Sequence, residues 1–498
     1  MQDNDNLSEI EIEDQKIIEN KELNIWEALI PVIALVIMLF YNVFFAYGDD
    51  ALSGSNQFIL LLGAAVAAIV GTYNKVPYRR MIEEVSENVK STTGAILILL
   101  MVGSLAGTWL ISGIIPTMIY YGLQILNPTI FLASCVVICA IISVATGSSW
   151  TTSATVGIAL IGISEALGIS LGMTAGAVLS GAYFGDKLSP LSDTTNLAPA
   201  MAGTDLFTHI KYMTITTVPT IVVTLIVFII IGLGLDPEGV ADTASILASI
   251  DSSFNINPWL FVVPVLVIVM IVKKTPPLIA LLAGTLLGAL GALIFQPEIV
   301  ATIGGAESLD FTSGYKGIMN AITVDTSVAT DNEALNDLFS AGGMSGMLGT
   351  IWLIICAMVF GGVMDAIGAL ARISKALLSL FHTTFGLFAS TVASCLALNV
   401  TASDQYLAIV VPGKMYAKAF KDKGLAPENL SRTLEDSGTV TSVLIPWNTC
   451  GAYQSGVLGV SVADYFFYAI FNWLSPFMTL LFAAFRIKIK MLTTPKTI

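Results

Sequence analysis

The sequence contains few charged residues and very little histidine. Asp, Glu, Lys and Arg make up 12% of the 498 residues, and His209 and His382 are the two histidines. It has no HExxH motif, no GxSxG motif and no Walker loop, and its cysteines and histidines form no cluster along the chain. Metal-dependent and nucleophilic enzymes need such groups close together, so the sequence disfavours an enzyme.

Cysteine is also scarce. All of the cysteines lie in or beside apolar runs, and the first two are one helical turn apart within one run. This placement favours small packing residues over metal ligands or disulfides. The cysteines are Cys135, Cys139, Cys356, Cys395 and Cys450.

Long apolar runs dominate what is present. Hydrophobic residues make up 55% of the chain and the mean hydropathy is +0.82. Several nearly uncharged runs approach the roughly 20 residues that cross a ~30 Å hydrocarbon core. We therefore expect an all-α polytopic membrane protein with about 11–13 transmembrane segments, forming one membrane domain of two halves. The runs are 26–47, 58–73, 130–145, 213–233, 260–272, 278–295 and 465–485.

The distribution of charge predicts the orientation. Lys and Arg in short loops stay on the cytoplasmic side, which places both termini in the cytoplasm. The first 24 residues are too acidic for the start of a cleaved signal peptide, so the span that begins at Trp26 is expected to be retained. The predicted divisions are an acidic cytoplasmic tail (1–24), a first half with the first transport repeat (25–235), an external loop (236–256), a second half with the second repeat (257–487) and its external loop (296–344), and a basic cytoplasmic tail (488–498).

Polar cassettes interrupt the apolar sequence once in each half. In both halves an apolar helix, a break, a second helix, an acidic residue and a Pro-containing break follow in the same order, and the acids matched in this way are Asp186 and Asp436. The apolar helices that follow are expected to run in opposite directions. This order predicts two inverted-topology repeats with broken or re-entrant helices and a site near the midplane. The cassettes are ATGSSWTTSAT (145–155), GAYFGDKLSPLSDTTN (181–196), LNVTASDQY (398–406) and RTLEDSGTVTSVLIPWNT (432–449).

The cassettes also predict a cation site. Unwound backbone at membrane depth survives only where it is buried in protein or lines a cavity. Its carbonyls, together with hydroxyl, amide and carboxylate groups, are the oxygen ligands that a hard cation such as Na⁺ prefers. The candidate Na⁺/H⁺ residues are Thr146, Ser148, Ser149, Thr151, Thr152, Asp186, Asp193, Thr194, Thr195, Asn196, Asn399, Thr401, Ser403, Asp404 and Asp436.

Each carboxylate in the first half has an alternative role. Carboxylates inside a membrane are costly unless they are solvated or paired, so they mark functional sites by default, and a buried carboxylate can hold either a proton or a metal cation. Asp186 could instead form a structural ion pair with Lys187. Asp193 could instead cap the helix that follows it.

The carboxylates in the second half leave similar alternatives open. Asp404 follows an unwound stretch and could be a helix cap or a ligand. Arg432, Glu435 and Asp436 lie within one or two helical turns and could form a salt-bridged face. A channel usually needs a continuous pore, whereas paired broken helices with acids in each half favour alternating access.

The motifs GSSWTTSATVG (147–157) and SGAYFGDKLSPLSDTTNLA (180–198) closely resemble the NhaC family of sodium/proton antiporters, over a core from about residue 90 to 485. The resemblance implies a secondary carrier of the bacterial inner membrane that exchanges internal Na⁺ for external H⁺. It leaves open a sodium- or proton-coupled carrier of malate, lactate or an amino acid. It implies no cofactor and no nucleic-acid partner; the lipid bilayer is the expected surrounding, and a homodimer stays open.

Overall fold

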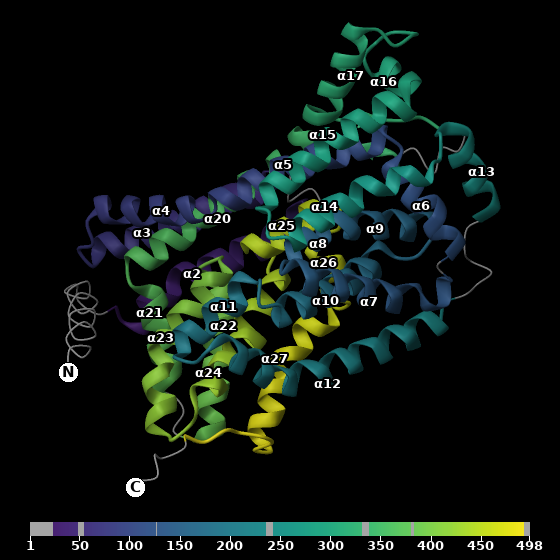
Figure 1. Ribbon diagram of the computed structural model, residues 1–498. Coiled ribbons are helices and arrows are strands. Elements are labelled where there is room, and N and C mark those ends of the chain that lie inside the picture. Colours follow the sequence, from purple (N-terminus) through teal and green to yellow (C-terminus); the bar gives the residue numbers. More distant parts are fainter. Residues whose placement is uncertain are drawn as a thin grey trace.

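The computed structural model describes residues 23–47, 54–125, 127–235, 243–330, 338–379 and 383–492. The predicted N-terminal tail lies outside the described residues except for its last two, and so do His382, parts of both predicted external loops and the last six residues of the chain. The described residues form helices and one short antiparallel strand pair, joined by loops, and Figure 1 shows the long helices packed side by side.

The first half consists of helices alone among its described residues. They are α2 (Ile25–Tyr41), η1 (Asn42–Tyr47), α3 (Ser55–Tyr73), α4 (Tyr78–Ser91), α5 (Thr93–Ile111), α6 (Ile114–Ile125), α7 (Pro128–Thr146), α8 (Ser149–Thr152), η3 (Ser153–Gly157), α9 (Ile158–Ala166), α10 (Leu171–Leu188), α11 (Asp193–Ala202) and α12 (Leu206–Leu233).

The second half adds the strand pair β1 (Thr326–Ser327) and β2 (Ser340–Ala341). Its helices are α13 (Thr243–Ser253), η5 (Pro258–Phe261), α14 (Val262–Val272), α15 (Pro277–Phe295), α16 (Pro297–Ile303), α17 (Phe311–Thr323), α19 (Gly343–Gly346), α20 (Leu348–Ala366), α21 (Ala369–Ser379), α22 (Thr384–Thr401), α23 (Gln405–Asp422), α24 (Pro427–Leu434), η6 (Glu435–Thr439), η7 (Ser442–Leu444), α25 (Thr449–Leu458), α26 (Val462–Tyr465) and α27 (Ile470–Ala484).

The prediction of a polytopic helical membrane protein is confirmed. Among the described residues, eight helices are long and apolar enough to cross a membrane, and the pair Ala244–Ser253 and Pro258–Val272, bent by 87°, would be a ninth span. Counted with the two shorter apolar helices α6 and α27, the described chain reaches the lower end of the predicted number of spans.

Residues 127–205 of the first half recur in the second half with a constant register. Several helices of the first half end at a residue with left-handed backbone (positive φ), and a residue with the same conformation occurs 256 positions later. The N-cap residues of helices recur at the same interval. Left-handed backbone strongly favours glycine, so its recurrence at fixed spacing marks equivalent turns. The left-handed pairs are Gly147 and Ser403, Gly168 and Gly424, and Gly203 and Gly459. The capping pairs are Asn127 and Thr383, Ser148 and Asp404, Ser192 and Asn448, and Asp205 and Ser461.

Hydrogen bonds between helices follow the same register. Ser143 Oγ of α7 donates to the Ala182 carbonyl of α10 at 2.6 Å, and Asn399 Nδ2 of α22 donates to the Gly438 carbonyl of η6 at 2.8 Å. The two donors are 256 positions apart, and so are the two acceptors. The repeats are therefore equivalent in packing as well as in the order of their elements.

The repeats have opposite topology. The start of α12 lies against the residues that follow α27, because the Tyr212 hydroxyl donates to the Lys488 carbonyl at 2.7 Å. Further along, Thr216 of α12 and Thr479 of α27 bind the same carboxylate. The last helices of the two repeats thus run antiparallel, as the inverted repeat predicts.

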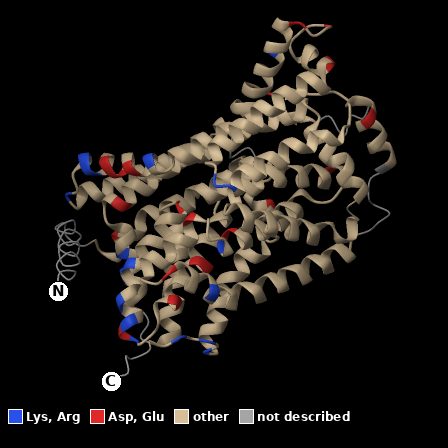
Figure 2. Cartoon of the chain, in the orientation of Figure 1, with Lys and Arg blue, Asp and Glu red and all other residues tan. Residues whose placement is uncertain are grey.

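The basic residues concentrate at one end of the molecule, where acidic residues also lie, and the other end is mainly acidic. Figure 2 shows Lys and Arg gathered around α4, α21, α23 and the residues after α27, whereas the end that carries α13, α16 and α17 shows mainly Asp and Glu. This division agrees with the clusters used to predict the cytoplasmic and external loops.

Candidate ion site at the junction of the two repeats

Both repeats break a helix in the same way near the centre of the chain's fold. In the first, Gly147 (φ 72°) ends α7 and the Ser148 hydroxyl caps α8 by accepting a hydrogen bond from Thr151 N–H at 3.2 Å. In the second, Ser403 (φ 60°) follows α22 and Asp404 caps α23 by accepting from Leu407 N–H at 3.0 Å. Asp404 therefore has the capping role left open by its sequence position.

Asp186 is held against the start of α8. Its Oδ2 accepts a hydrogen bond from Ser149 N–H at 3.1 Å and from the Ser149 hydroxyl at 2.6 Å. The Thr195 hydroxyl donates to the Asp186 carbonyl at 3.1 Å, which ties α11 to the same point. A carboxylate at a helix N-terminus is stabilised by the free N–H groups and the positive end of the helix dipole.

A cavity of about 470 Å³ lies where the breaks of the two repeats meet. Segments from both repeats line it together with the start of α5 and the link between α14 and α15. Trp150 and Tyr406, which are 256 positions apart, lie on its wall, so the cavity sits at the junction that the inverted repeat predicts. The candidate residues that line it are Thr146, Ser148, Thr151, Asp186, Asp193, Thr194 and Asp404.

Two of these lining residues have free polar groups. The hydroxyl of Thr146, which is 7% exposed, has no hydrogen-bond partner among the described residues. Asp193 is exposed and occupies the first position of α11, whose cap is Ser192, with its hydroxyl accepting from Thr195 N–H at 3.4 Å. The capping alternative for Asp193 is therefore wrong, and the residue lines the cavity.

Most of the other candidates have structural hydrogen bonds. Thr152 and Thr401 donate to carbonyls within their own helices, and Asn196 donates to the Pro190 and Ser192 carbonyls and so closes the loop before α11. Asn399 joins α22 to η6 and accepts a bond from Asn448. The Ser403 carbonyl accepts from Thr449 N–H at 2.9 Å.

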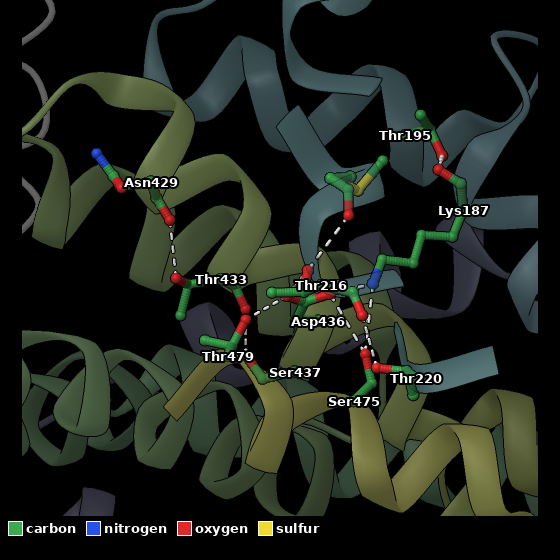
Figure 3. A network of polar contacts seen from close by, with 11 residues as sticks. Lys187, Thr195, Thr216, Thr220, Asn429, Thr433, Asp436, Ser437, Ser475 and Thr479 are labelled. Carbon is green, nitrogen blue, oxygen red and sulfur yellow. Dashed lines mark hydrogen bonds and ion pairs between the residues drawn. The ribbon is translucent and has the colours of Figure 1, made fainter. Parts of the chain in front are cut away.

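Asp436 lies away from the cavity in a closed network of polar side chains. Its carboxylate forms an ion pair with Lys187 of α10, and both side chains are fully buried. It also accepts from Thr216 at 2.9 Å and from Thr479, and contacts Ser475 at 3.3 Å (Figure 3). Lys187 thus pairs with Asp436 and not with Asp186.

The structural register also corrects the match between Asp186 and Asp436. At an interval of 256 positions, Asp186 corresponds to Ser442, and Asp436 corresponds to Ser180. Each carboxylate therefore occurs in one repeat only.

The salt-bridged face proposed for Arg432, Glu435 and Asp436 is not formed. The Arg432 guanidinium lies over the Tyr212 ring at 4.8 Å, and neither its nitrogens nor the Glu435 carboxylate has a hydrogen-bond partner among the described residues. Both side chains are fully buried.

Sequence reasoning missed the hydroxyl partners of Asp436. These partners are Thr216 of α12 and Ser475 and Thr479 of α27. Thr216 begins a row of buried threonines at four-residue spacing in α12, with Thr220 and Thr224. This polar stripe at helical spacing is the signal that could have located Thr216.

No group of three His, Cys, Asp or Glu side chains within the described parts of the chain is arranged to hold a metal ion. The five cysteines are free and buried, in keeping with their predicted packing role.

Comparisons with known proteins identify a family and relatives that agree with this architecture. The model of the Na⁺/H⁺ antiporter family matches residues 181–487, more than half of the chain. The Na⁺/H⁺ antiporter NhaC of Alkalihalophilus pseudofirmus is 38% identical over 85% of this chain and 88% of its own length. The chain belongs to the NhaC family of Na⁺/H⁺ antiporters.

Other relatives show how widely the transported solutes vary. A malate-2H⁺/Na⁺-lactate antiporter of Bacillus subtilis is 36% identical over 84% of this chain and 86% of its own length. An arginine/ornithine antiporter of Halobacterium salinarum is 30% identical over 91% of this chain and 90% of its own length. These relatives are transporters, and the NhaC-family chain described here is a multi-pass membrane protein like them.

Proposed function

We propose that this NhaC-family protein extrudes Na⁺ from a bacterial cell in exchange for H⁺, in the cytoplasmic membrane with both termini inside. The observation that carries the proposal is the cavity at the junction of the two repeats, with the carboxylate of Asp186 in its wall. Secondary transporters with inverted repeats bind their ions at such a junction, where broken helices offer free backbone groups and helix ends.

The two cations exchange by competing for the carboxylate of Asp186, and Asp193 adds a second acidic ligand on the same cavity wall. Asp186 binds either H⁺ or Na⁺, and the Ser149 hydroxyl that now donates to it can rotate to offer its oxygen to the cation. The hydroxyls of Thr146 and Ser148, on the same cavity wall, supply further neutral oxygen ligands. Competition of the two cations for one carboxylate couples their movements, because the empty, charged site is costly to carry through the membrane core.

The shape of the cavity indicates a state open towards the cytoplasm. Its wall includes Ser91, the last residue of α4, and the link Lys274–Pro277. Arg79 and Arg80 at the start of α4 and Lys274 in the link belong to the basic clusters predicted to be cytoplasmic. On the opposite side, Trp150 stacks on Tyr453 with ring centroids 3.9 Å apart, and the Tyr453 hydroxyl donates to the Trp150 carbonyl at 3.2 Å. This aromatic contact joins the two repeats and closes the external path.

A second contact, between α25 and α20, closes the external side as well. The repeat predicts an equivalent contact on the cytoplasmic side. A Cβ added at Gly456 of α25 would lie 2.3 Å from the Thr350 hydroxyl at the start of α20, so these helices touch. Helices α5 and α20 match at an interval of 255, which makes Ala95 the counterpart of Thr350, and Ala200 is the counterpart of Gly456. Ala95 lines the cavity and Ala200 is exposed. Closing the cytoplasmic side would bring them together, and alternating access is then an exchange of these two contacts.

Carriage of an organic acid fits the cavity less well. Among the described residues, its wall carries the carboxylates of Asp186, Asp193 and Asp404 and a single basic side chain, Lys274. An organic anion would face net negative charge, which costs binding free energy.

Transport by purified protein in proteoliposomes tests the proposal. Addition of Na⁺ alone should start proton movement in the wild type, and Asp186→Asn should abolish it while the protein stays folded. Asp193→Asn tests whether the second cavity carboxylate also holds the ion, and we expect it to abolish sodium-coupled transport as well. Proton movement that requires malate, lactate or an amino acid would refute Na⁺/H⁺ exchange and move the assignment to a solute carrier.

A further inference from the structure

The cavity is larger than a sodium ion needs. At ~30 Å³ per water, even a shell of six waters around Na⁺ occupies only about 180 Å³. The cavity holds about 470 Å³, which falls in the range of about 300–1,000 Å³ found for sites that bind small organic molecules. Its size therefore admits an organic solute.

The charge of the wall selects the sign of that solute. Three carboxylates line the cavity, and Lys274 is its one basic side chain among the described residues. Asp404 has one oxygen committed to capping α23, and Asp186 is hydrogen-bonded to Ser149, but Asp193 is exposed and makes no side-chain hydrogen bond within the described parts of the chain. The wall thus attracts a cation and leaves at least one carboxylate available to it.

The remaining surface suits an organic cation. Trp150 and Tyr406 line the cavity, and aromatic rings attract ammonium groups through cation–π interactions. The buried Thr146 hydroxyl on the same wall lacks a partner among the described residues, so it can accept a hydrogen bond from an N–H donor. A bare metal ion uses the hydroxyl but gains little from the aromatic rings.

We infer that the cavity binds small alkylammonium ions in competition with Na⁺. The inference rests on the proposed Na⁺ site, because both cations use the same acidic wall. The ammonium group lies near the cavity carboxylates, its N–H groups reach Thr146, and its alkyl part contacts Trp150 and Tyr406.

Equilibrium binding of radioactive Na⁺ to the purified protein in detergent tests the inference without any pH gradient that an amine could dissipate. Ethylammonium, tetramethylammonium and succinate are the added probes. Both ammonium ions should displace Na⁺, ethylammonium at the lower concentration because it alone can donate to Thr146, and succinate should not. Failure of both ammonium ions to displace bound Na⁺, or displacement by succinate, would overturn the inference.

Variants separate specific binding from ionic screening. Tyr406→Leu removes one aromatic ring from the cavity wall and should weaken tetramethylammonium binding, relative to Na⁺ binding in the same variant, by about tenfold. Tyr315→Leu is the matched control, because Tyr315 is 61% exposed on α17 and does not line the cavity. Equal ratios in both variants and the wild type would show a screening effect and contradict the inference.

Thermal unfolding without Na⁺ keeps the two proposals distinguishable. A ligand that binds the native state raises its melting temperature with concentration. If the protein binds no Na⁺ but ethylammonium raises the melting temperature and succinate does not, the result supports a cavity that binds organic cations and refutes the proposed Na⁺/H⁺ exchange. If Na⁺ raises the melting temperature and ethylammonium does not, exchange stands and the inference fails.

Discussion

The two repeats share their backbone but not their charges. Between residues 127 and 205 the turns and helix caps of the first repeat recur 256 positions later in the second. Yet Asp186 faces the cavity where the second repeat has Ser442, and Asp436 binds Lys187 where the first repeat has Ser180. The shared backbone provides two equivalent broken helices, and the unshared carboxylate Asp186 is the reason that we propose the first of them as the ion site.

The largest effect is expected from removing the charge of Asp186, compared with a change at the equivalent position, Ser442. Asp186→Asn should reduce Na⁺-driven proton movement to the level of protein-free liposomes, because the site loses the carboxylate for which both cations compete. Ser442→Ala removes a single hydroxyl from the other repeat and should leave the rate within about fivefold, since a neutral hydrogen bond contributes about 1 kcal/mol. Equal loss in both variants would mean that the repeats contribute equally to the site.

The buried ion pair should matter for stability. Lys187→Met leaves the Asp436 charge buried without its partner and should lower the free energy of unfolding by about 3–5 kcal/mol. The double change Lys187→Val with Asp436→Ser copies Val443 and Ser180, the residues at the corresponding positions, and should recover most of that loss. Thermal unfolding in detergent measures both, and a double variant as unstable as Lys187→Met would contradict the structural role.

The smallest effect concerns the hydrogen bonds that join the helices in each repeat. Ser143→Ala removes one bond to a carbonyl and should cost about 1 kcal/mol. Asn399→Ala removes bonds to Gly438 and Thr441 and leaves Asn448 with one partner fewer, so it should cost about 2–3 kcal/mol. Denaturation of the two variants side by side checks the order, and the reverse order would show that the repeats are not equivalent there.

The broken helices and part of the site could be predicted from sequence. Gly147 and Pro190 interrupt otherwise apolar runs, and polar groups at membrane depth must line a cavity or be buried, which identified Asp186, Ser148 and Asp404 as cavity residues. The opposite direction of the last helices followed from the positions of Lys and Arg.

The partners of the buried charges could not be predicted. Lys187 and Asp436 are 249 positions apart, and the sequence around each residue gives no indication that the other is its partner. Matching the halves by their acids gave the wrong register, because the repeats retain turns and caps rather than carboxylates. The left-handed glycines Gly168 and Gly203, with Gly424 and Gly459, carry the correct register and require φ values that the sequence alone does not reveal.

The exchange of contacts between the repeats is the central claim, and access to the cavity tests it most directly. In a cysteine-free background carrying Ala95→Cys, a membrane-impermeant maleimide applied from the cytoplasmic side should label the cavity. Gly456→Val forces α25 away from Thr350 and should slow that labelling by favouring the outward-open state. Ala200→Val, at the equivalent position, should block closure of the cytoplasmic side and leave labelling as fast or faster. Labelling that responds to neither change, or slows equally in both, would contradict alternating access through these repeats.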